Sequence, residues 1–253
     1  MLRDNNGMIE QMQWVPACEA ELEQQLVLTN GYLSQTAHFE EFCSCGQCLE
    51  TYVKDIKEPI LNISGISVRL HDERLDLGTW EVMDFYRCLH KDTPLLERSF
   101  VVKSPKGHTL SVRSKRQLLD TKELMRIEYE VTSVDYKGPI SLLTILGGMT
   151  DKIPNWYTLM NQLDQKYCWL WLQLHDVEVQ LCCAMKWQVL LNGMPLEKRP
   201  IKIEKPHTIG YSLTTNIKPG DTCMLCKTVA VVDSLHHEKD KLIDHSIACL
   251  TNL

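Results

Sequence analysis

The sequence lacks any apolar stretch long enough to cross a membrane. A spanning helix needs about 18 or more largely apolar residues, whereas the best candidate, residues 138–150, is shorter and is broken by Pro139 and by Gly147 and Gly148. A basic and apolar leader is lacking too, because residues 1–6 run straight into polar side chains. We therefore expect a cytoplasmic protein without a membrane partner.

Positive charge is in deficit, with 27 Lys and Arg residues against 33 Asp and Glu residues and a net charge of -6. Such a chain exerts no long-range attraction on phosphate backbones, so we expect no nucleic-acid partner. Hydrophobic residues make up 44% of the sequence and charged residues 24%, a balance that excludes a disordered chain. The length of 253 residues fits one large β domain or two ordinary domains.

The common catalytic motifs are missing: the sequence has no Ser-centred elbow, no Gly-rich phosphate loop and no His-Glu-x-x-His run. Glu128 and Glu130 are paired carboxylates on one face of a predicted strand. Acid/base chemistry needs such a pair in a cleft with one raised pKa, whereas this spacing is typical of a solvated sheet edge. We therefore predict no catalytic residue and no cofactor.

The 11 cysteines are odd in number and scattered. Two Cys-x-x-Cys pairs, Cys45/Cys48 and Cys223/Cys226, have the spacing of zinc ligands. They lie far apart, however, and strand alternation points Cys223 and Cys226 to opposite faces. Buried or incidental thiols in a reducing compartment are the favoured interpretation, and no metal site is predicted.

From residue 66 onwards, apolar and polar residues alternate with a period of two, which predicts half-buried strands. Turns with Asn-Gly or Pro-x-Gly chemistry separate them at residues 104–107, 192–193 and 218–221. Strands joined in this way, with little helix between, predict an antiparallel β-sandwich rather than a βαβ fold. The alternation is clearest in these apolar sets: Ile66, Val68 and Leu70; Leu110 and Val112; Met125, Ile127, Tyr129 and Val131; Leu170, Leu172 and Leu174.

Helix is expected only near the two ends of the chain. Residues 1–16 resemble an arm, and residues 17–28 favour a short helix that can feed a strand. Near the C-terminus, helical spacing recurs at Leu242, Ile243, Ile247 and Leu250, but this helix lacks an obvious partner. His237, Asp240 and Asp244 share one face of it by the i, i+3, i+7 rule, which is more typical of a solvated linker than of a metal site.

Aromatic residues are the main candidates for ligand contact, because exposed indoles stack on sugar rings. Trp80 lies near a Gly-Thr turn, Trp156 and Tyr157 follow Pro154 in an expected loop, and His90 follows a predicted strand. We predict these four residues, Trp80, Trp156, Tyr157 and His90, as carbohydrate-binding residues. Core packing is the competing interpretation for the tryptophans.

The segment Thr29-Asn30-Gly31-Tyr32-Leu33, with Phe39-Glu40-Glu41 and Thr51-Tyr52-Val53, resembles the opening signature of glycoside hydrolase family 65. That family contains the maltose, trehalose and kojibiose phosphorylases. Further segments follow in family order up to Trp156, whereas several glycines of the signature are replaced, as at Thr29. The chain therefore resembles a divergent member of the family.

The resemblance implies a fold that agrees with the residue pattern: a large antiparallel β-sandwich of the galactose mutarotase-like type, or super-sandwich. The expected division is an N-terminal arm and helix over 1–22, the β-sandwich over 23–234 and the start of a helical linker over 235–253. The family's catalytic (α/α) barrel, with its general-acid Glu and phosphate site, is expected to follow that linker. No catalytic residue is therefore carried over to this chain.

The implied function is a non-catalytic N-terminal domain of a family 65 hydrolase or disaccharide phosphorylase that acts on α-glucosides. It would pack on the barrel, shape the sugar site and support a homodimer. One alternative is a stand-alone aldose mutarotase-like enzyme, which needs a His pair and a Glu on one concave sheet face. The candidates are His71, His90, His108, His175 and Glu128. Another alternative is a carbohydrate-binding or assembly module.

Overall fold

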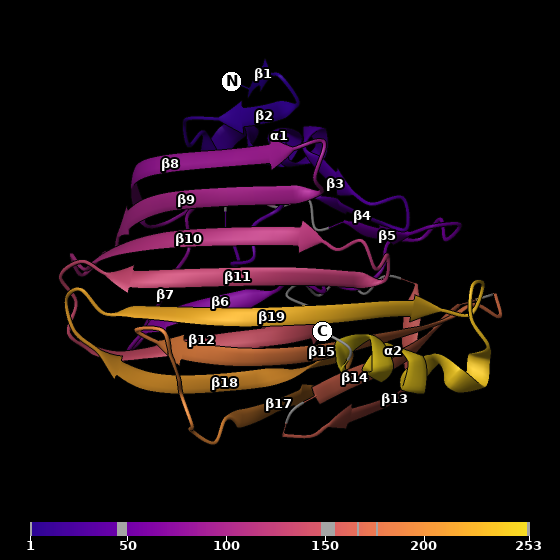
Figure 1. The fold of residues 1–253 in the computed structure, drawn as a ribbon. Coiled ribbons are helices and arrows are strands. Elements are labelled where there is room, and N and C mark those ends of the chain that lie inside the picture. The colour runs from indigo at the N-terminus through magenta and orange to yellow at the C-terminus, as the bar shows by residue number, and fades with distance from the viewer. Residues whose placement is uncertain (1, 45–49, 148–154, 166, 176, 252–253) are drawn as a thin grey trace.

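The computed structural model describes residues 2–44, 50–147, 155–165, 167–175 and 177–251. Antiparallel strands dominate it, as the alternation predicts, and they form three sheets (Figure 1). Within the described residues the largest sheet has 11 strands, with β16 (Met194–Pro195) paired to β15 beside the main path. The path runs in this order: β1 (Leu2–Asn5), β2 (Met8–Gln11), β8 (Glu81–His90), β9 (Leu95–Lys103), β10 (Thr109–Leu118), β11 (Leu124–Ser133), β19 (Thr222–Asp233), β15 (Gln180–Leu191), β14 (Tyr167–Leu174) and β13 (Trp156–Leu163).

Two smaller sheets supply the second layer, and side chains of all three sheets share one apolar core. The five-stranded sheet runs in the order β17 (Ile201–Lys205), β18 (Thr208–Ile217), β12 (Gly138–Gly147), β6 (Ile66–Leu70) and β7 (Glu73–Arg74). The three-stranded sheet contains β3 (Val27–Thr29), β4 (Leu33–Thr36) and β5 (Thr51–Val53). The predicted β-sandwich is therefore confirmed.

The alternation in β11 matches the two environments of the large sheet. Met125, Ile127 and Tyr129 are fully buried in the core, whereas Glu128 between them is exposed on the outer face. A one-residue shift of register would exchange these faces, so this pattern determines which side of the strand joins the core.

The Asn-Gly turn leads to a different strand from the expected one at residues 201–203, whereas the turn at residues 218–221 joins the two strands expected. Asn192 and Gly193 both have positive φ, of 50° and 80°, as a two-residue hairpin turn requires. This hairpin joins β15 to the short β16, and β17 belongs to the other layer. Residues 218–221 carry the chain from β18 in the small sheet to β19 in the large one, so this turn crosses between layers.

The N-terminal residues form strands of the large sheet, whereas the sequence suggests an arm. β1 and β2 form a hairpin, and β2 pairs with β8 at one edge of the large sheet. The 3-10 helix η1 (Pro16–Cys18) then leads into α1 (Glu19–Gln25). Of the two options for residues 17–28, a short helix that feeds a strand is therefore confirmed, because α1 ends at Gln25 and β3 begins at Val27.

The C-terminal helix has a partner after all. The 3-10 helix η2 (Lys239–Lys241) precedes α2 (Leu242–Thr251), which lies across the outer face of the large sheet (Figure 1). Leu242 and Leu250 pack there against Trp169 and other residues of β14, β15 and β19. In the described part of the chain, no helix is both long and apolar enough to span a membrane.

Candidate functional site

The four residues predicted to bind carbohydrate lie at three separate places. Trp80 and His90 are at opposite ends of the ten-residue strand β8, and such a strand is about 33 Å long. Trp156 and Tyr157 begin β13, which lies at the other end of the sheet order from β8. The structure therefore brings only Trp156 and Tyr157 together.

The surroundings of these four residues differ. Trp80 is 5% exposed and Trp156 is 2% exposed, and the indole Nε1 of Trp156 donates a 3.0 Å hydrogen bond to the carbonyl of Pro59. Tyr157 is half-buried with its ring 5.0 Å from that of His175. His90 is half-buried with Nε2 3.0 Å from Glu97 Oε2. Carbohydrate binding at these positions stays a prediction, and the two buried indoles have the environment of core residues.

The histidines considered for a mutarotase-like site are also dispersed. His71 is in the turn between β6 and β7, His108 in the turn between β9 and β10, and His175 follows β14. Glu128 is exposed on the outer face of the large sheet. Each histidine also has a different neighbour: His71 pairs with Asp72 and His90 with Glu97, whereas the rings of His108 and His175 contact Tyr136 and Tyr157. The geometry therefore does not favour that alternative.

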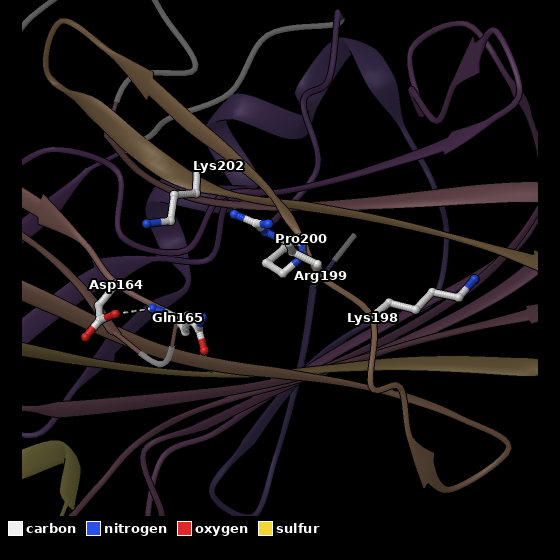
Figure 2. Close-up of a pocket in the computed structure, with 6 residues that line it drawn as sticks. All are labelled: Asp164, Gln165, Lys198, Arg199, Pro200 and Lys202. Carbon is white, nitrogen blue, oxygen red and sulfur yellow. Dashed lines mark hydrogen bonds between the residues drawn. The ribbon is translucent and has the colours of Figure 1, made fainter.

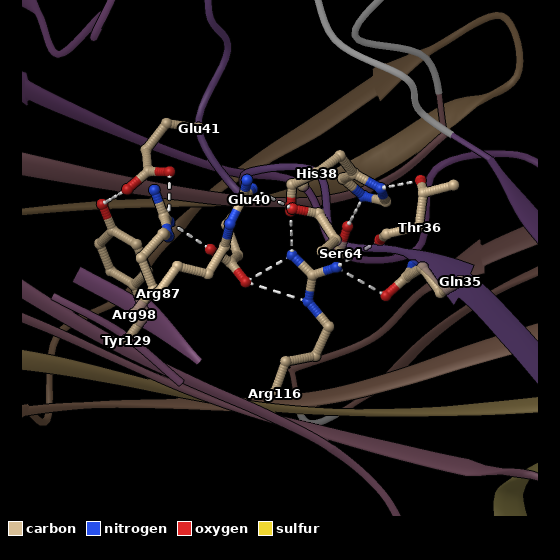
Figure 3. Close-up of polar contacts among 12 residues, drawn as sticks. Gln35, Thr36, His38, Glu40, Glu41, Ser64, Arg87, Arg98, Arg116 and Tyr129 are labelled. Atoms are coloured by element: carbon tan, nitrogen blue, oxygen red, sulfur yellow. Dashed lines mark hydrogen bonds and ion pairs between the residues drawn. The ribbon is translucent and has the colours of Figure 1, made fainter. Parts of the chain in front are cut away.

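A buried polar network joins the two layers instead (Figure 3). Its centre is Arg116 of β10, which is fully buried. Nε and Nη2 of Arg116 donate to Glu40 Oε1 at 3.0 and 2.6 Å. Nη1 donates to Gln35 Oε1 at 2.8 Å, and Nη2 also donates to the carbonyl of His38 at 2.6 Å. One guanidinium thus holds the whole segment 35–40 against the large sheet.

Arg98 of β9 completes the charge balance beside Arg116. It pairs with Glu40 and, at 2.6 Å, with Glu41, whose carboxylate also accepts a hydrogen bond from the Tyr129 hydroxyl. Burial alone would raise the pKa of Glu40, but Arg116 and Arg98 outweigh it and hold that pKa well below its usual range. Glu40 is therefore a buried, ionised carboxylate between two cations.

Arg87 of β8 makes a second ion pair at the edge of the network. Its Nη2 is 2.6 Å from Glu19 Oε1, with both side chains fully buried, and its Nη1 donates to the carbonyl of Ala37 at 2.8 Å. His38 lies nearby, with Nε2 2.6 Å from Ser64 Oγ. Burial and the charge of Arg116 hold the pKa of His38 well below its usual value, so this ring is neutral.

Lys227 of β19 is a buried cation of a different kind. Its Nζ donates to the carbonyls of Ile145, at 2.7 Å, and Gly65, at 3.3 Å. Burial lowers the pKa of Lys227 to about 7, because a desolvated ammonium is disfavoured. Lys227 therefore links β19 to the second layer.

The Asn30-Gly31-Tyr32 part of the signature has a structural role, because Asn30 makes hydrogen bonds within the turn and to another turn. Asn30 Oδ1 accepts from the backbone N–H groups of Tyr32 and Leu33 at 3.1 and 2.9 Å, and its Nδ2 donates to the carbonyls of Leu119 and Lys122. Gly31 between them has φ 84°, a conformation that favours glycine. The motif thus fastens the start of β4 to the turn between β10 and β11.

Two open hollows lie between the edge strands β13 and β17. The first has a volume of about 600 Å³ and is lined by Asp164, Gln165, Lys198, Arg199, Pro200 and Lys202 (Figure 2). Lys202 Nζ donates to the carbonyl of Leu163 at 2.6 Å across it. With three cations and one carboxylate, this hollow can accept an anion or the acidic surface of another domain.

The second hollow, of about 470 Å³, is lined by residues 158–161 and 204–207. Thr158 Oγ1 is 2.9 Å from His207 Nδ1 in it. Leu159, Met160 and Ile201 are exposed along the same two strands. Among the described residues, none that belongs to the buried network lines either of these two hollows.

The cysteines form no shared site among the described residues. Cys223 is buried and Cys226 is half-buried, both as free thiols, and Cys45 and Cys48 lie outside the described residues. Cys43 is disulfide-bonded, whereas the sequence favours buried or incidental thiols in a reducing compartment.

The fold and the network define a large two-layer β-sandwich domain whose layers are joined by buried ion pairs. The chain belongs to glycoside hydrolase family 65, because the family model described as "Glycosyl hydrolase family 65, N-terminal domain" matches residues 9–252. This confirms the resemblance seen up to Trp156 and extends it through the rest of the sandwich.

A solved structure of a presumed kojibiose phosphorylase from the human microbiome has a similar fold, with a TM-score of 0.86 and 16% sequence identity. The similarity covers 99% of this chain and 36% of that chain. At this identity the likeness describes the fold alone. No curated protein matches the sequence.

Proposed function

We propose that this chain is the non-catalytic N-terminal β-sandwich of a family 65 enzyme that acts on α-glucosides in carbohydrate metabolism. The observation that carries the proposal is the family match over residues 9–252. The burial of the signature residues supports it, because Phe39, Glu40 and Glu41 are buried between the two layers and Glu41 pairs there with Arg98. Catalysis is then the task of an (α/α) barrel that this domain contacts.

The chemistry of the complete enzyme follows from the resemblance. Phosphate with inversion, or water, attacks the α-glucoside while a Glu of the barrel protonates the leaving oxygen. The sandwich supports this reaction by packing on the barrel, shaping the rim of its sugar site and supporting a homodimer.

The surface between β13 and β17 is the face that best fits the barrel. It combines the cationic hollow at Lys198, Arg199 and Lys202 with the exposed apolar side chains of Met160 and Ile201. Protein interfaces characteristically combine an apolar centre with charged groups that select the partner. We assign an acidic, partly apolar surface of the barrel as the partner of this face.

The proposal is tested by immunoprecipitating the native protein with an antibody against the sandwich. Peptide mass spectrometry should find a family 65 barrel, in the same chain or as a bound subunit. The precipitate should release glucose 1-phosphate or glucose from kojibiose, maltose or trehalose, whereas the purified 253-residue chain should release neither. A precipitate without a barrel, or activity of the purified chain alone, would contradict the proposal.

Charge-reversal variants test the docking face. The double variant Lys198→Glu, Lys202→Glu should lose functional docking to the barrel in the same experiment. If the barrel is a separate subunit, it should be missing from the precipitate; if it lies in the same chain, the precipitate should release less glucose 1-phosphate or glucose. Lys54→Glu, an exposed change beside β5, is the matched control and should retain docking. Equal retention by both variants would exclude this face.

A further inference from the structure

Three ligand-type side chains from distant segments meet beside α2. Glu123 lies in the turn between β10 and β11, His237 in the loop after β19, and His245 on α2 itself. One ligand atom of each lies within 4.8 Å of the others. Helical spacing groups His237 instead with Asp240 and Asp244, on a face that the sequence indicates to be a solvated linker. The chain changes from η2 to α2 at Leu242, so those residues do not share one continuous helix.

The geometry of this trio matches a metal centre. His237 Nε2 and Glu123 Oε1 are 3.5 Å apart, and the rings of His237 and His245 are 4.2 Å apart between centroids. Zinc binds imidazole nitrogen and carboxylate oxygen at about 2.0–2.2 Å, so two ligands of one tetrahedral ion are separated by about 3.4 Å. Small side-chain rotations are therefore enough to place all three atoms around one ion.

Two of the three residues are held in place by their backbones. The carbonyl of Glu123 accepts from the N–H of Val231 at 2.9 Å, and the N–H of His237 donates to the carbonyl of Asp233 at 3.1 Å. The side chains of His237 and Glu123 are 21% and 20% exposed. An ion can therefore enter from solvent and find a site that is mostly formed, which lowers the cost of ordering the ligands.

The donor set favours zinc over the hard cations. Calcium and magnesium prefer oxygen ligands throughout, whereas two imidazoles with one carboxylate are a common zinc set.

We propose that Glu123, His237 and His245 bind one zinc ion that fastens α2 and the loop after β19 to the turn between β10 and β11. The ion adds a cross-link between three segments that are distant in sequence. It fixes the position of α2 on the outer face of the large sheet.

The test uses the purified 253-residue chain, stripped of metal with a chelator and then titrated with zinc chloride alone at about pH 7.5, where imidazole is largely neutral. Isothermal titration should show one saturable site. The melting temperature should rise by about 5–10 °C at a free zinc concentration a hundred times the Kd. Cobalt should give the intense visible bands of a tetrahedral site.

Variants separate this site from other zinc-binding groups, such as the thiols. Glu123→Gln, His237→Gln and His245→Gln should each weaken zinc binding at least about 10-fold. The matched control His71→Gln removes an exposed histidine paired with Asp72 and should bind zinc as the parent does. Circular dichroism without zinc checks that each variant is folded. Glu123 lies in a turn, so Glu123→Gln keeps the test usable if His245→Gln in the helix does not fold. No saturable site in the parent, or binding that none of the three changes weakens, would overturn the proposal.

Discussion

Arginine and lysine at inward positions of strands are the residues that distinguish this sandwich. Arg87 is in phase with Phe85 and Leu89, Arg98 with Leu96 and Phe100, and all of these side chains face the core. Burying an unpaired charge costs several kcal/mol. The nearby carboxylates of Glu19, Glu40 and Glu41 pair with these cations and offset that cost. This pairing explains why these three acidic residues are buried.

Removal of one buried carboxylate should therefore be costly. Glu40→Gln leaves Arg116 and Arg98 without the charge that both of them contact. We expect the free energy of unfolding to fall by about 3–5 kcal/mol, as for other broken buried pairs. Urea denaturation measures the change. Asp72→Asn, which breaks the exposed pair with Lys106, is the control and should change stability little; an equally small effect of Glu40→Gln would refute the argument.

Lys227 should make stability depend on pH. Its pKa falls from 10.5 in the unfolded chain to about 7 in the folded protein, so between these values the unfolded chain binds the extra proton. The contribution of Lys227 to stability therefore increases as the pH rises through this window. Relative to Lys227→Met, the parent should gain about 1.4 kcal/mol per pH unit between about pH 8 and pH 9. Urea unfolding of both proteins with a reducing agent measures this, and a constant difference would show that Lys227 does not titrate there.

At the scale of elements, α2 converts an outer sheet face into a second small core. It covers Trp169, Cys182, Ala184, Ala230 and Val232 on three neighbouring strands. The sequence already places Trp169 opposite Leu170, so both faces of β14 carry large apolar groups. Such a strand requires a cover on both sides, and α2 supplies the outer one.

The accessibility of Cys182, which lies beneath α2, measures how well the helix covers the sheet. Its Sγ is 3.3 Å from Ser246 Oγ of α2, and burial raises its pKa to about 12. The double variant Leu242→Ala, Leu250→Ala removes apolar contacts of the helix, each worth about 2–5 kcal/mol. We expect faster alkylation of Cys182 by iodoacetamide, measured by peptide mass spectrometry. Cys183 faces the other side and is the internal control; equal labelling of both would indicate general unfolding instead of release of α2.

At the scale of the whole molecule, one apolar core spans the large sheet and both smaller sheets. The chain passes between layers at the β18–β19 turn, and the Arg116–Glu40 contacts and Lys227 join the layers inside. The two layers therefore share their main core, and the second, small core lies outside it under α2. The shared core makes the sandwich one structural unit despite its length.

Cooperative unfolding follows from the shared core. Far-UV circular dichroism, which reports on the strands, and tryptophan fluorescence, which reports on all six tryptophans, should give coincident transitions in urea. Separate midpoints for the two signals would mean that one layer unfolds before the other. That result would contradict the role assigned to the buried network.

The alternation of the strands, the short N-terminal helix and the family were predictable from local sequence. The network was harder to predict, although its signal is present: Arg98, Arg116 and Lys227 stand in the apolar phase of otherwise regular strands. Periodicity shows that such a residue faces inward, but not which carboxylate it meets. Arg116 and Glu40 are 76 residues apart, and only the pairing of strands brings them together.

The sequence by itself determined the class of fold, because a period of two assigns each strand residue to a face, and it determined the family through the order of its motifs. The tertiary structure decided which elements each strand face packs against. In the folded protein Trp80 and Trp156 are buried, and Phe39, Glu40 and Glu41 lie between the two layers. Helix α2 packs on the large sheet, and His237 and His245 lie beside Glu123. The physical reason is that periodicity depends on neighbours in the chain, whereas ion pairs, cover and metal ligands depend on groups that only the folded backbone brings within a few ångströms.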